Sequence, residues 1–449
     1  MNTLSVLYLN PEELCADPRN ARTHSEKQIG QIATSIERFG FNNPILIDNR
    51  NQVVAGHGRL AASRKLGLEA VPAIRLEHLS AAQRKAYIIA DNRLAELAGW
   101  DDETLAIELQ GLLEMDLDFE ITDLGFEMGE IDILLGDSTG TSGREPEEGP
   151  SSGEDVPAWA RVGDLWQLGP HLLFCGDALD SASYDILLGS SKARLVFTDP
   201  PYNVPIGGHV SGLGKATHRG FIQASGEMSP ECFSNFLRDA CIRMRDASEN
   251  GSIHFICMDW RHIADLVAAG SCVYSEFKNI CVWVKSNGGM GTLYRSRHEL
   301  VAVFKAGTAS HRNNVQLGVH GRYRTNVWEY DGMNSFQAGR DSKLAMHPTI
   351  KPVALTADAI LDCSSRGDLV LDPFAGSGTT ILAAERTGRR CRAIELDPLY
   401  VDVALNRYWQ MIGQAPVNLW TGDRYVPPRR ADESRQTLAD GFAGREGHA

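Results

Sequence analysis

Residues 369–380 read LVLDPFAGSGTT, and they decide the fold that we expect for the larger part of this chain. The run 369–372 is typical of a buried strand, and the glycine-rich turn after it leads into a helix at Thr379 or Thr380. Glycines in such a turn let the backbone approach a ligand closely. The next apolar run ends in Glu395, 19 residues after Gly376. An acid at this distance accepts hydrogen bonds from ribose hydroxyls in nucleoside-binding βαβ units.

The glycines of this loop do not match the patterns that bind phosphate groups. No Gly-Lys-Ser/Thr follows them, and the full G-x-G-x-x-G pattern is absent from residues 374–380. A nucleoside ligand without a pyrophosphate therefore fits the loop better than a dinucleotide. An ordinary tight turn is the alternative for the glycine pair alone, and the flanking strands together with Glu395 favour a ligand site.

Residues 196–203 read VFTDPPYN and also follow an expected strand. They should therefore lie at the carboxyl edge of a sheet, where open α/β folds bind ligands. The two prolines have no N–H group, so the carbonyls and the Asp199 carboxylate serve as acceptors beside the flat ring of Tyr202. This combination suits an exocyclic amino group on a planar base, with stacking of ~1–3 kcal/mol. A rigid surface turn is the alternative for the tetrapeptide alone.

Taken together, residues 162–421 resemble the amino-group DNA methyltransferases that use S-adenosylmethionine. The DPPY of residues 199–202 is similar to the catalytic motif of that family, and the FAGSG of residues 374–378 is similar to its cofactor motif. The catalytic motif comes first, which is the order of the permuted β group. Three further blocks resemble family segments in their expected places: CGDA at 175–178, residues 283–299, and HPTIKP at 347–352.

The resemblance implies a Rossmann-like α/β methyltransferase sheet and direct methyl transfer to the exocyclic amino group of a base flipped out of double-stranded DNA. It implies no metal and no covalent cysteine intermediate. The leading Asp favours adenine N6, and cytosine N4 stays the alternative. The implied catalytic residues are Asp199, Pro200, Pro201 and Tyr202. The implied cofactor-binding residues are Asp177, Lys351, Pro352, Asp372, Phe374, Gly376, Ser377, Gly378, Thr379 and Glu395.

The chain has 449 residues and a formal net charge of −14, which is unevenly distributed. Residues 101–155 hold 18 acids and one base, and the rest of the chain is slightly basic. Residues 278–343 hold ten Lys or Arg and four acids, which suits contact with DNA phosphates. The arginines that we expect to contact DNA are Arg295, Arg297, Arg322 and Arg324. Residues 207–226 are a glycine-rich flap over DNA or a disordered loop.

The order of these features predicts a domain at residues 1–100, an acidic helical segment and linker at 101–155, a methyltransferase domain at 156–425, and a disordered tail. In the methyltransferase domain, apolar runs of β type alternate with helical stretches. They predict a largely parallel sheet covered on both faces. The expected strands cover residues 194–198, 252–257, 279–284, 300–304, 369–372 and 391–395.

Residues 53–67 read VVAGHGRLAASRKLG and resemble the glycine-arginine segment of ParB-like and sulfiredoxin-like domains, a likeness that covers residues 7–95. The resemblance implies a nucleotide or DNA at Gly56, Gly58, Arg59 and Arg64, and a helix start with an arginine favours an anion. His57 replaces the cysteine of sulfiredoxins, which argues against their chemistry. A helix with solvated bases is the alternative for this segment, and a nuclease is the alternative for the N-terminal domain. For the chain as a whole, the rival of the methyltransferase is a DNA- or nucleotide-binding regulator that uses the methylase fold for binding.

Nine scattered cysteines without a C-x-x-C pair, no apolar run long enough to cross a bilayer, and no secretory signal predict a cytoplasmic protein. The sequence leaves open the recognition sequence, a homodimer, and a restriction enzyme as partner.

Overall fold

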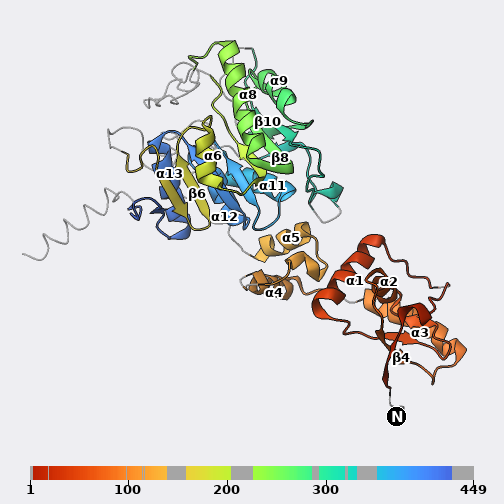
Figure 1. Ribbon diagram of the computed structural model, residues 1–449. Helices are drawn as coiled ribbons and strands as arrows, with labels where there is room; N and C mark the ends of the chain where they lie inside the picture. Colours follow the sequence, from red (N-terminus) through yellow and green to blue (C-terminus); the bar gives the residue numbers. More distant parts are fainter. Residues whose placement is uncertain are drawn as a thin grey trace, which may run out of the picture. The chain divides into compact units, whose positions relative to one another are not determined.

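The computed structural model describes residues 4–18, 20–97, 99–113, 115, 117–138, 158–203, 226–285, 293–318, 322–330 and 351–426. It divides the chain into two compact units, Met1–Thr141 and Ser142–Ala449 (Figure 1). The predicted linker after Ser138, nearly all of the segment 207–226, and the predicted tail beyond Val426 lie outside the described residues. Within the described part of the chain, no helix has the length and apolar character needed to cross a membrane.

The first unit is built on a four-stranded sheet in the order β1-β4-β2-β3. One helix of this unit ends at Gly40, which has φ +85°, and Ser80 and Gln83 form a capping box at the start of another. Strand β1 was missed because it is an edge strand whose side chains all remain at least partly exposed. The elements are β1 (Val6–Leu9), η1 (Pro11–Glu13), α1 (Glu26–Phe39), β2 (Ile45–Ile47), β3 (Val53–Ala55), α2 (His57–Lys65), β4 (Val71–Arg75) and α3 (Ala81–Glu96).

The acidic segment forms short helices, as predicted: α4 (Asp102–Leu113), η2 (Ile121–Leu124) and α5 (Met128–Ser138). These helices share a small core of their own, and η2 packs against α1 within the first unit. Two ion pairs support this packing, between Lys27 and Glu127 at 2.7 Å and between Arg38 and Asp123 at 3.5 Å. The segment is therefore part of the first unit instead of a separate connector, because its acids face the few bases of α1.

The second unit contains one ten-stranded sheet in the order β11-β9-β10-β8-β7-β12-β13-β6-β5-β14. All six predicted strands are present, and four others were missed: three short strands at or near the edges, and β6, which lies beside β13 in the parallel part of the sheet. The strands are β5 (Leu165–Leu168), β6 (His171–Cys175), β7 (Ala193–Thr198), β8 (Ser248–Met258), β9 (Glu276–Val284), β10 (His298–Lys305), β11 (Val327–Glu329), β12 (Leu369–Asp372), β13 (Arg390–Glu395) and β14 (Val417–Asn418).

The prediction of a largely parallel sheet holds for the centre of the sheet and is wrong for its sides. Strands β8, β7, β12, β13 and β6 run parallel to one another. By contrast, β10 pairs antiparallel with both neighbours, and β5 does the same on the other side. An apolar run shows that a strand is buried, but the direction in which it pairs depends on the connections and not on its composition.

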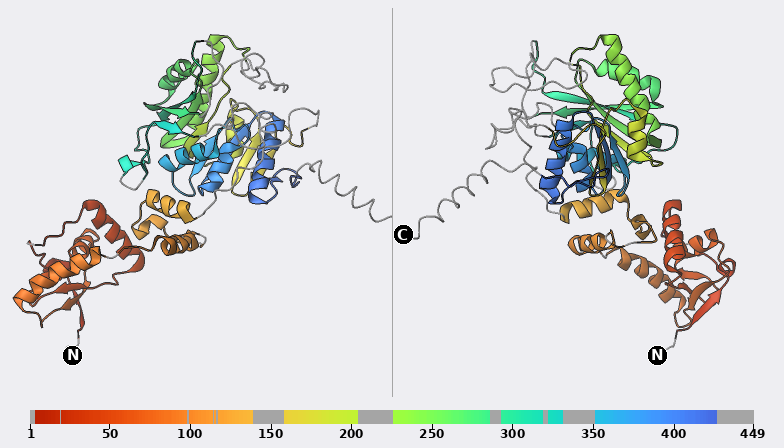
Figure 2. Two further views of the ribbon diagram at one scale, coloured as in Figure 1. Left: turned by 180° about the vertical axis from the view of Figure 1, so that it is seen from behind. Right: turned by 60° about the vertical axis from the view of Figure 1, so that its left-hand side comes forward.

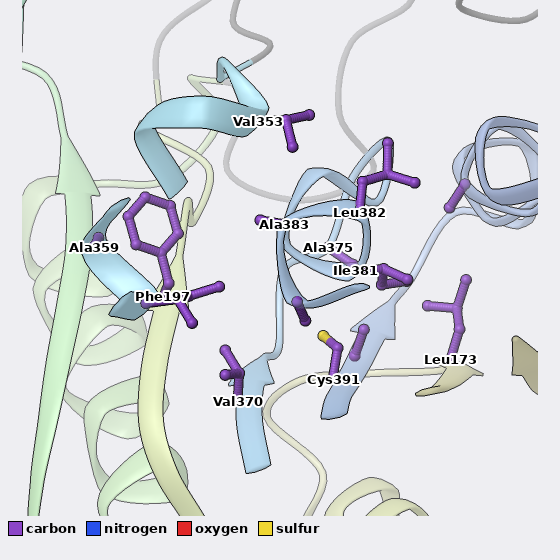
Figure 3. Close-up of a cluster of buried hydrophobic side chains, with 14 of the residues drawn as sticks. Leu173, Phe197, Val353, Ala359, Val370, Ala375, Ile381, Leu382, Ala383 and Cys391 are labelled. Atoms are coloured by element: carbon purple, nitrogen blue, oxygen red, sulfur yellow. The ribbon is translucent and has the colours of Figure 1, made fainter. Parts of the chain in front are cut away.

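Helices cover both faces of this sheet, as predicted (Figures 1 and 2). The helices are α6 (Ser181–Leu188), α8 (Pro230–Asp246), α9 (Ile263–Val273), α11 (Val353–Cys363), α12 (Thr379–Arg386) and α13 (Pro398–Ile412). Along β7, Leu195 and Phe197 pack with α11, α12 and α13, whereas Val196 packs with α6, α8 and α9. Figure 3 shows the first of these layers, where Phe197 and Val370 of the sheet lie below side chains of α11 and α12.

Candidate active site

The two motifs of the sequence meet at one edge of the sheet. Strands β7 and β12 are parallel neighbours, with Leu195 paired to Val370 and Val196 to Leu371. Their carboxyl ends therefore carry the DPPY motif and the glycine loop side by side. Both motifs line a single cavity, together with residues from the ends of β6 and β13 and from the start of α11.

Two glycines of the loop are required for different reasons. Gly378 has φ +78° at the start of α12, and a Cβ there would lie 2.7 Å from the Cβ of Ala404 on α13. Gly376 has φ +50°, and a Cβ on it would meet open space. Gly376 therefore supplies the left-handed turn and leaves free room on the cavity side, whereas Gly378 allows α12 and α13 to pack closely.

Glu395 fixes the shape of this loop from the end of β13. Its Oε2 accepts a hydrogen bond from the Gly376 N–H at 2.7 Å, and its Oε1 accepts one from the Asp397 N–H at 2.8 Å. Burial raises the pKa of Glu395 to about 7, although these two backbone bonds act in the opposite direction. The carboxylate lines the cavity with acceptor capacity to spare.

Asp372 links the strand of the DPPY motif to the helix after the glycine loop through hydrogen bonds. Its carboxylate accepts hydrogen bonds from the Thr198 hydroxyl on β7 at 2.7 Å and from the Thr380 hydroxyl on α12 at 2.6 Å. It also accepts the Phe374 N–H at 3.2 Å. Burial raises the pKa of Asp372 to about 6, against the effect of these bonds. The residue therefore sets the spacing between the catalytic strand and the glycine loop.

Arg407 of α13 supports the glycine loop from below, and sequence reasoning missed it. Its side chain is fully buried, and Nη1 donates to the Ser377 carbonyl at 2.9 Å and to the Ser377 hydroxyl at 2.7 Å. The Thr379 hydroxyl lies 3.2 Å from the same nitrogen. Ser377 and Thr379 thus use their polar groups on Arg407. Nothing in the local pattern of α13 separates this arginine from a surface base.

The DPPY motif carries a cluster of polar groups within the cavity. Lys351 Nζ lies 2.6 Å from Asp199 Oδ2 and 3.2 Å from the Tyr202 hydroxyl, which itself donates to Asp199. Burial raises the pKa of Asp199, and the Lys351 ammonium partly offsets that rise. Burial also raises the pKa of Tyr202 well above its ordinary value, and both nearby carboxylates add to the rise. The phenol is therefore neutral and a donor.

Two further residues complete the cluster from the antiparallel side of the sheet. Glu299 on β10 lies 2.7 Å from Lys351 Nζ and pairs on its other side with Lys285, which follows β9. Burial alone would raise the pKa of Glu299, but Lys351 and Lys285 outweigh it and lower this pKa to about 2. Both residues lie in the block 283–299 that resembles the family, yet sequence reasoning assigned them no role.

The arginines that we expected at DNA fall into two groups. Arg295 and Arg297 are exposed just before β10. Arg322 and Arg324 are mostly buried, and both pair with Asp362 of α11, at 2.7 Å and 3.1 Å. Asp358 contacts both arginines as well. The second pair therefore braces the segment 322–330 against α11, which sequence alone could not reveal because the partners lie 38 and 40 residues away.

The glycine-arginine segment of the first unit forms a turn and the start of α2. Gly56 has φ +100° and precedes the helix, and the Arg59 guanidinium folds back so closely that a Cβ on Gly56 would lie 2.9 Å from its Nη2. A Cβ on Gly58 would meet Ile32 of α1 at 2.9 Å. Arg64 donates instead to the carbonyls of η1 and its C-cap, at 3.0 Å and 2.8 Å. Arg59 is thus near the turn, and Arg64 anchors η1.

Three family models match the chain in succession. A ParB N-terminal domain matches residues 2–92, a ParB-methyltransferase HTH domain matches residues 103–161, and a DNA methylase of the N6/N4 type matches residues 193–406. The HTH match falls on the segment that we expected to be an acidic helical linker. Residues 101–138 contain no Lys or Arg, so these helices offer no side-chain cation to a phosphate.

Two proteins of Escherichia coli (strain K12) match at the sequence level. The DNA adenine methyltransferase YhdJ is 30% identical over 252 residues, which cover 52% of this chain and 80% of YhdJ. The ParB-like nuclease domain-containing protein YnaK is 42% identical over 82 residues, covering 18% of this chain and 94% of YnaK. This chain belongs to the amino-group DNA methylases. It is an S-adenosylmethionine-dependent DNA methyltransferase with a ParB-like N-terminal domain.

Solved structures also resemble the DNA methyltransferase. TTHA0409 from Thermus thermophilus, a putative DNA modification methylase complexed with S-adenosylmethionine, is 22% identical with a TM-score of 0.38. The match covers 54% of this chain and 96% of that one.

The cavity of the methyltransferase fits its methyl donor. Glu395 and the open side of Gly376 suit a ribose, as the spacing of the sequence predicts. Thr356 on α11 lines the same cavity, and its buried hydroxyl has no hydrogen-bond partner among the described residues, so a polar group of a ligand would satisfy it. Pro352 caps α11 beside it. Asp177, which we expect near the cofactor, accepts the Leu179 N–H with one oxygen, and its neighbours Gly176 and Ala178 line the cavity.

Proposed function

We propose that this methyltransferase modifies adenine at N6 in double-stranded DNA. The observation that carries the proposal is the Asp199 carboxylate, held at the cavity beside the Tyr202 ring and next to the glycine loop. A carboxylate is a stronger acceptor for an amino N–H than the serine hydroxyl that the alternative would favour. The relative YhdJ, named as an adenine methyltransferase, supports this choice. Cytosine N4 is the alternative target.

In this proposal the flipped base stacks on Tyr202, while Asp199 and the Pro200 carbonyl accept hydrogen bonds from its amino group. Pro201 fixes the backbone between Pro200 and Tyr202. These contacts orient the nitrogen lone pair, so the contribution is positioning and electrostatics. Bound S-adenosylmethionine supplies the electrophilic methyl group. The residues that we propose to hold it are Asp177, Lys351, Pro352, Asp372, Phe374, Gly376, Ser377, Gly378, Thr379 and Glu395.

The test is methyl transfer from labelled S-adenosylmethionine to DNA by the full chain and by Asp199→Ala. We expect the substitution to abolish transfer while cofactor binding persists. Asp239→Ala, a substitution of an exposed residue on α8, is the control and should leave transfer unchanged. Mass spectrometry of the digested DNA then identifies the product nucleoside. Transfer by Asp199→Ala would refute the role of the carboxylate, and N4-methylcytosine would refute the choice of base.

We propose that Arg295 and Arg297 contact DNA phosphates, because both are exposed and belong to the basic stretch 278–343. For Arg322 and Arg324 we propose a bracing role, since their guanidinium groups already face Asp358 and Asp362. The slope of log K for DNA binding against log salt concentration measures the number of phosphates that the protein contacts.

For the ParB-like domain we propose that the turn at Gly56 and Gly58 binds a nucleoside triphosphate or a DNA phosphate, with Arg59 as the cation. Its guanidinium is half buried beside the turn, and its Nε has no hydrogen-bond partner among the described residues. Arg59→Ala should weaken the binding of labelled nucleoside triphosphates or of DNA, and intact binding of both would refute the site. Sedimentation with and without nucleotide tests the homodimer.

A further inference from the structure

Four charged side chains meet at the DPPY motif from four separate parts of the chain. Asp199 follows β7, Lys285 follows β9, Glu299 lies on β10, and Lys351 precedes α11. They alternate in sign along a chain of contacts, since Lys351 lies 2.6 Å from Asp199 and 2.7 Å from Glu299, and Glu299 pairs with Lys285. Lys351 and Glu299 keep only 5% and 8% of their side-chain surface exposed.

Burying the charges of Lys351 and Glu299 is costly unless close pairing offsets the loss of hydration. An apolar packing of these positions would be as stable or more stable, so the cluster calls for a chemical explanation. The chemistry at Asp199 provides one, because an ionised carboxylate accepts an amino N–H more strongly than the neutral acid does, and the ionised form is the one that can take up a proton. Its surroundings are otherwise unfavourable to that charge. Burial and the negative charge of Glu299 both raise the pKa of Asp199, and Lys351 opposes them.

We propose that Lys351 keeps Asp199 ionised so that Asp199 takes the proton released by the methylated nitrogen, and that Glu299 and Lys285 are positioning residues for Lys351. This inference rests on the proposed function of Asp199. In the reaction, the target nitrogen bonds to the methyl carbon as the carbon–sulfur bond breaks, and sulfur keeps that electron pair. The nitrogen then releases a proton to Asp199, the N–H electrons stay on nitrogen, and the carboxyl becomes neutral.

The other groups that face Asp199 do not supply a positive charge. The Tyr202 phenol and the Cys257 thiol both have a pKa raised well above the ordinary value, mainly by burial, so both are neutral. Asp372 and Glu299 are acids. Within the part of the chain that the structure describes, Lys351 is the cation in contact with Asp199. The protonation of Asp199 therefore depends on this ammonium.

This arrangement predicts opposite effects for two substitutions. Removing an opposite charge within 4–6 Å of a carboxylate raises its pKa by about 1–3. On the acid side of the pH–rate profile, which we call the acid limb, the rate falls as Asp199 becomes protonated. Lys351→Met should therefore move the acid limb to a pH that is higher by about 1–3. Glu299→Gln removes a like charge, so it should move the limb downward or leave it in place. Lys285→Met should act in the direction of Lys351→Met but less strongly, because Lys285 reaches Asp199 only through Glu299 and Lys351.

The experiment is the single-turnover rate of methyl transfer in the full chain, with DNA and S-adenosylmethionine bound, measured from acid to alkaline pH for each variant. Lys351→Arg keeps the charge and should restore the acid limb lost in Lys351→Met. The double variant Lys351→Met with Glu299→Gln removes one charge of each sign, so its limb should return toward that of the unchanged protein. A rate for Lys351→Met that is lower by the same factor at every pH would overturn the proposal, as would an upward shift in Glu299→Gln.

Two controls separate this inference from its foundation. Circular dichroism and the melting temperature of each variant report whether the domain is folded, and S-adenosylmethionine binding by Glu299→Gln and Lys285→Met reports whether the cavity is intact. Asp199→Asn, which has the shape of the native residue without its charge, should be inactive at every pH. If Asp199→Asn transfers methyl groups normally, the proposed function of Asp199 fails. If it is inactive while Lys351→Met shows an unshifted pH profile, the role of the charge chain alone fails.

Discussion

The substitution Glu395→Gln offers a sharp test of how the methyl donor is held. The two carboxylate oxygens accept from two different backbone donors, the N–H groups of Gly376 and Asp397, at 2.7 Å and 2.8 Å. A glutamine has one oxygen and one NH₂ group. It can therefore satisfy only one of these N–H groups, and its own NH₂ then faces the other donor.

The cost follows from this mismatch. A buried donor left without an acceptor costs about 1–3 kcal/mol, which corresponds to a dissociation constant about 5- to 150-fold higher for a ligand that needs the native loop. The loss of a charged acceptor for the ribose hydroxyls acts in the same direction. We expect isothermal titration calorimetry at pH 8 to show weakening in this range for S-adenosylmethionine. Glu231→Gln, an exposed substitution in the first turn of α8, should bind as the unchanged protein does.

The pH dependence gives a second readout of the same residue. Burial raises the pKa of Glu395 to about 7, so the free protein holds this group mostly protonated at pH 6 and mostly ionised at pH 8. A ligand that requires the carboxylate should therefore bind about tenfold more tightly at pH 8 than at pH 6. Glu395→Gln lacks this titratable group, so any pH dependence of S-adenosylmethionine binding that remains in this variant comes from other groups, including those of the ligand. Equal pH dependence in both proteins, or unchanged affinity in Glu395→Gln, would refute the reasoning.

Three further predictions concern stability and DNA. Arg322→Ala leaves Arg324 as the remaining cation beside the buried Asp362, so calorimetry should show the free energy of unfolding falling by about 1.5–3 kcal/mol, and an unchanged melting curve would contradict the bracing role. The double variant Arg295→Ala with Arg297→Ala should reduce the slope of log K against log salt by about 0.9 per lost phosphate contact, whereas an unaltered slope would exclude both contacts. Burial raises the pKa of Asp372 to about 6, above its value in the unfolded chain. The native state therefore binds this proton more tightly, so the contribution of Asp372 to stability should fall as pH rises from about 4 to 6, and the difference between the unfolding free energies of the unchanged protein and Asp372→Asn should change over that range.

The fold was largely predictable because its central strands are continuous apolar runs. All four residues of β12 are buried, and the glycine loop, the helix start at Thr379 and the acid at the end of β13 follow in the expected order. The sides of the sheet were not predictable in the same way. Short edge strands such as β11, with one buried residue in three, carry little apolar signal, and strand direction is set by connections.

For the candidate site, the sequence by itself determined the chemistry of each motif, because local spacing fixes what one strand end and one loop present. It indicated the acceptors of DPPY, the left-handed glycines and the acid of the next strand. Only the tertiary structure decided which distant charges meet these groups. It placed Glu299, Lys285 and Arg407 at the site. It also paired Arg322 with Asp362, so that this arginine is mostly buried instead of exposed. An ion pair between residues far apart in sequence leaves no periodic pattern, since charge pairing depends on which strands and helices become neighbours.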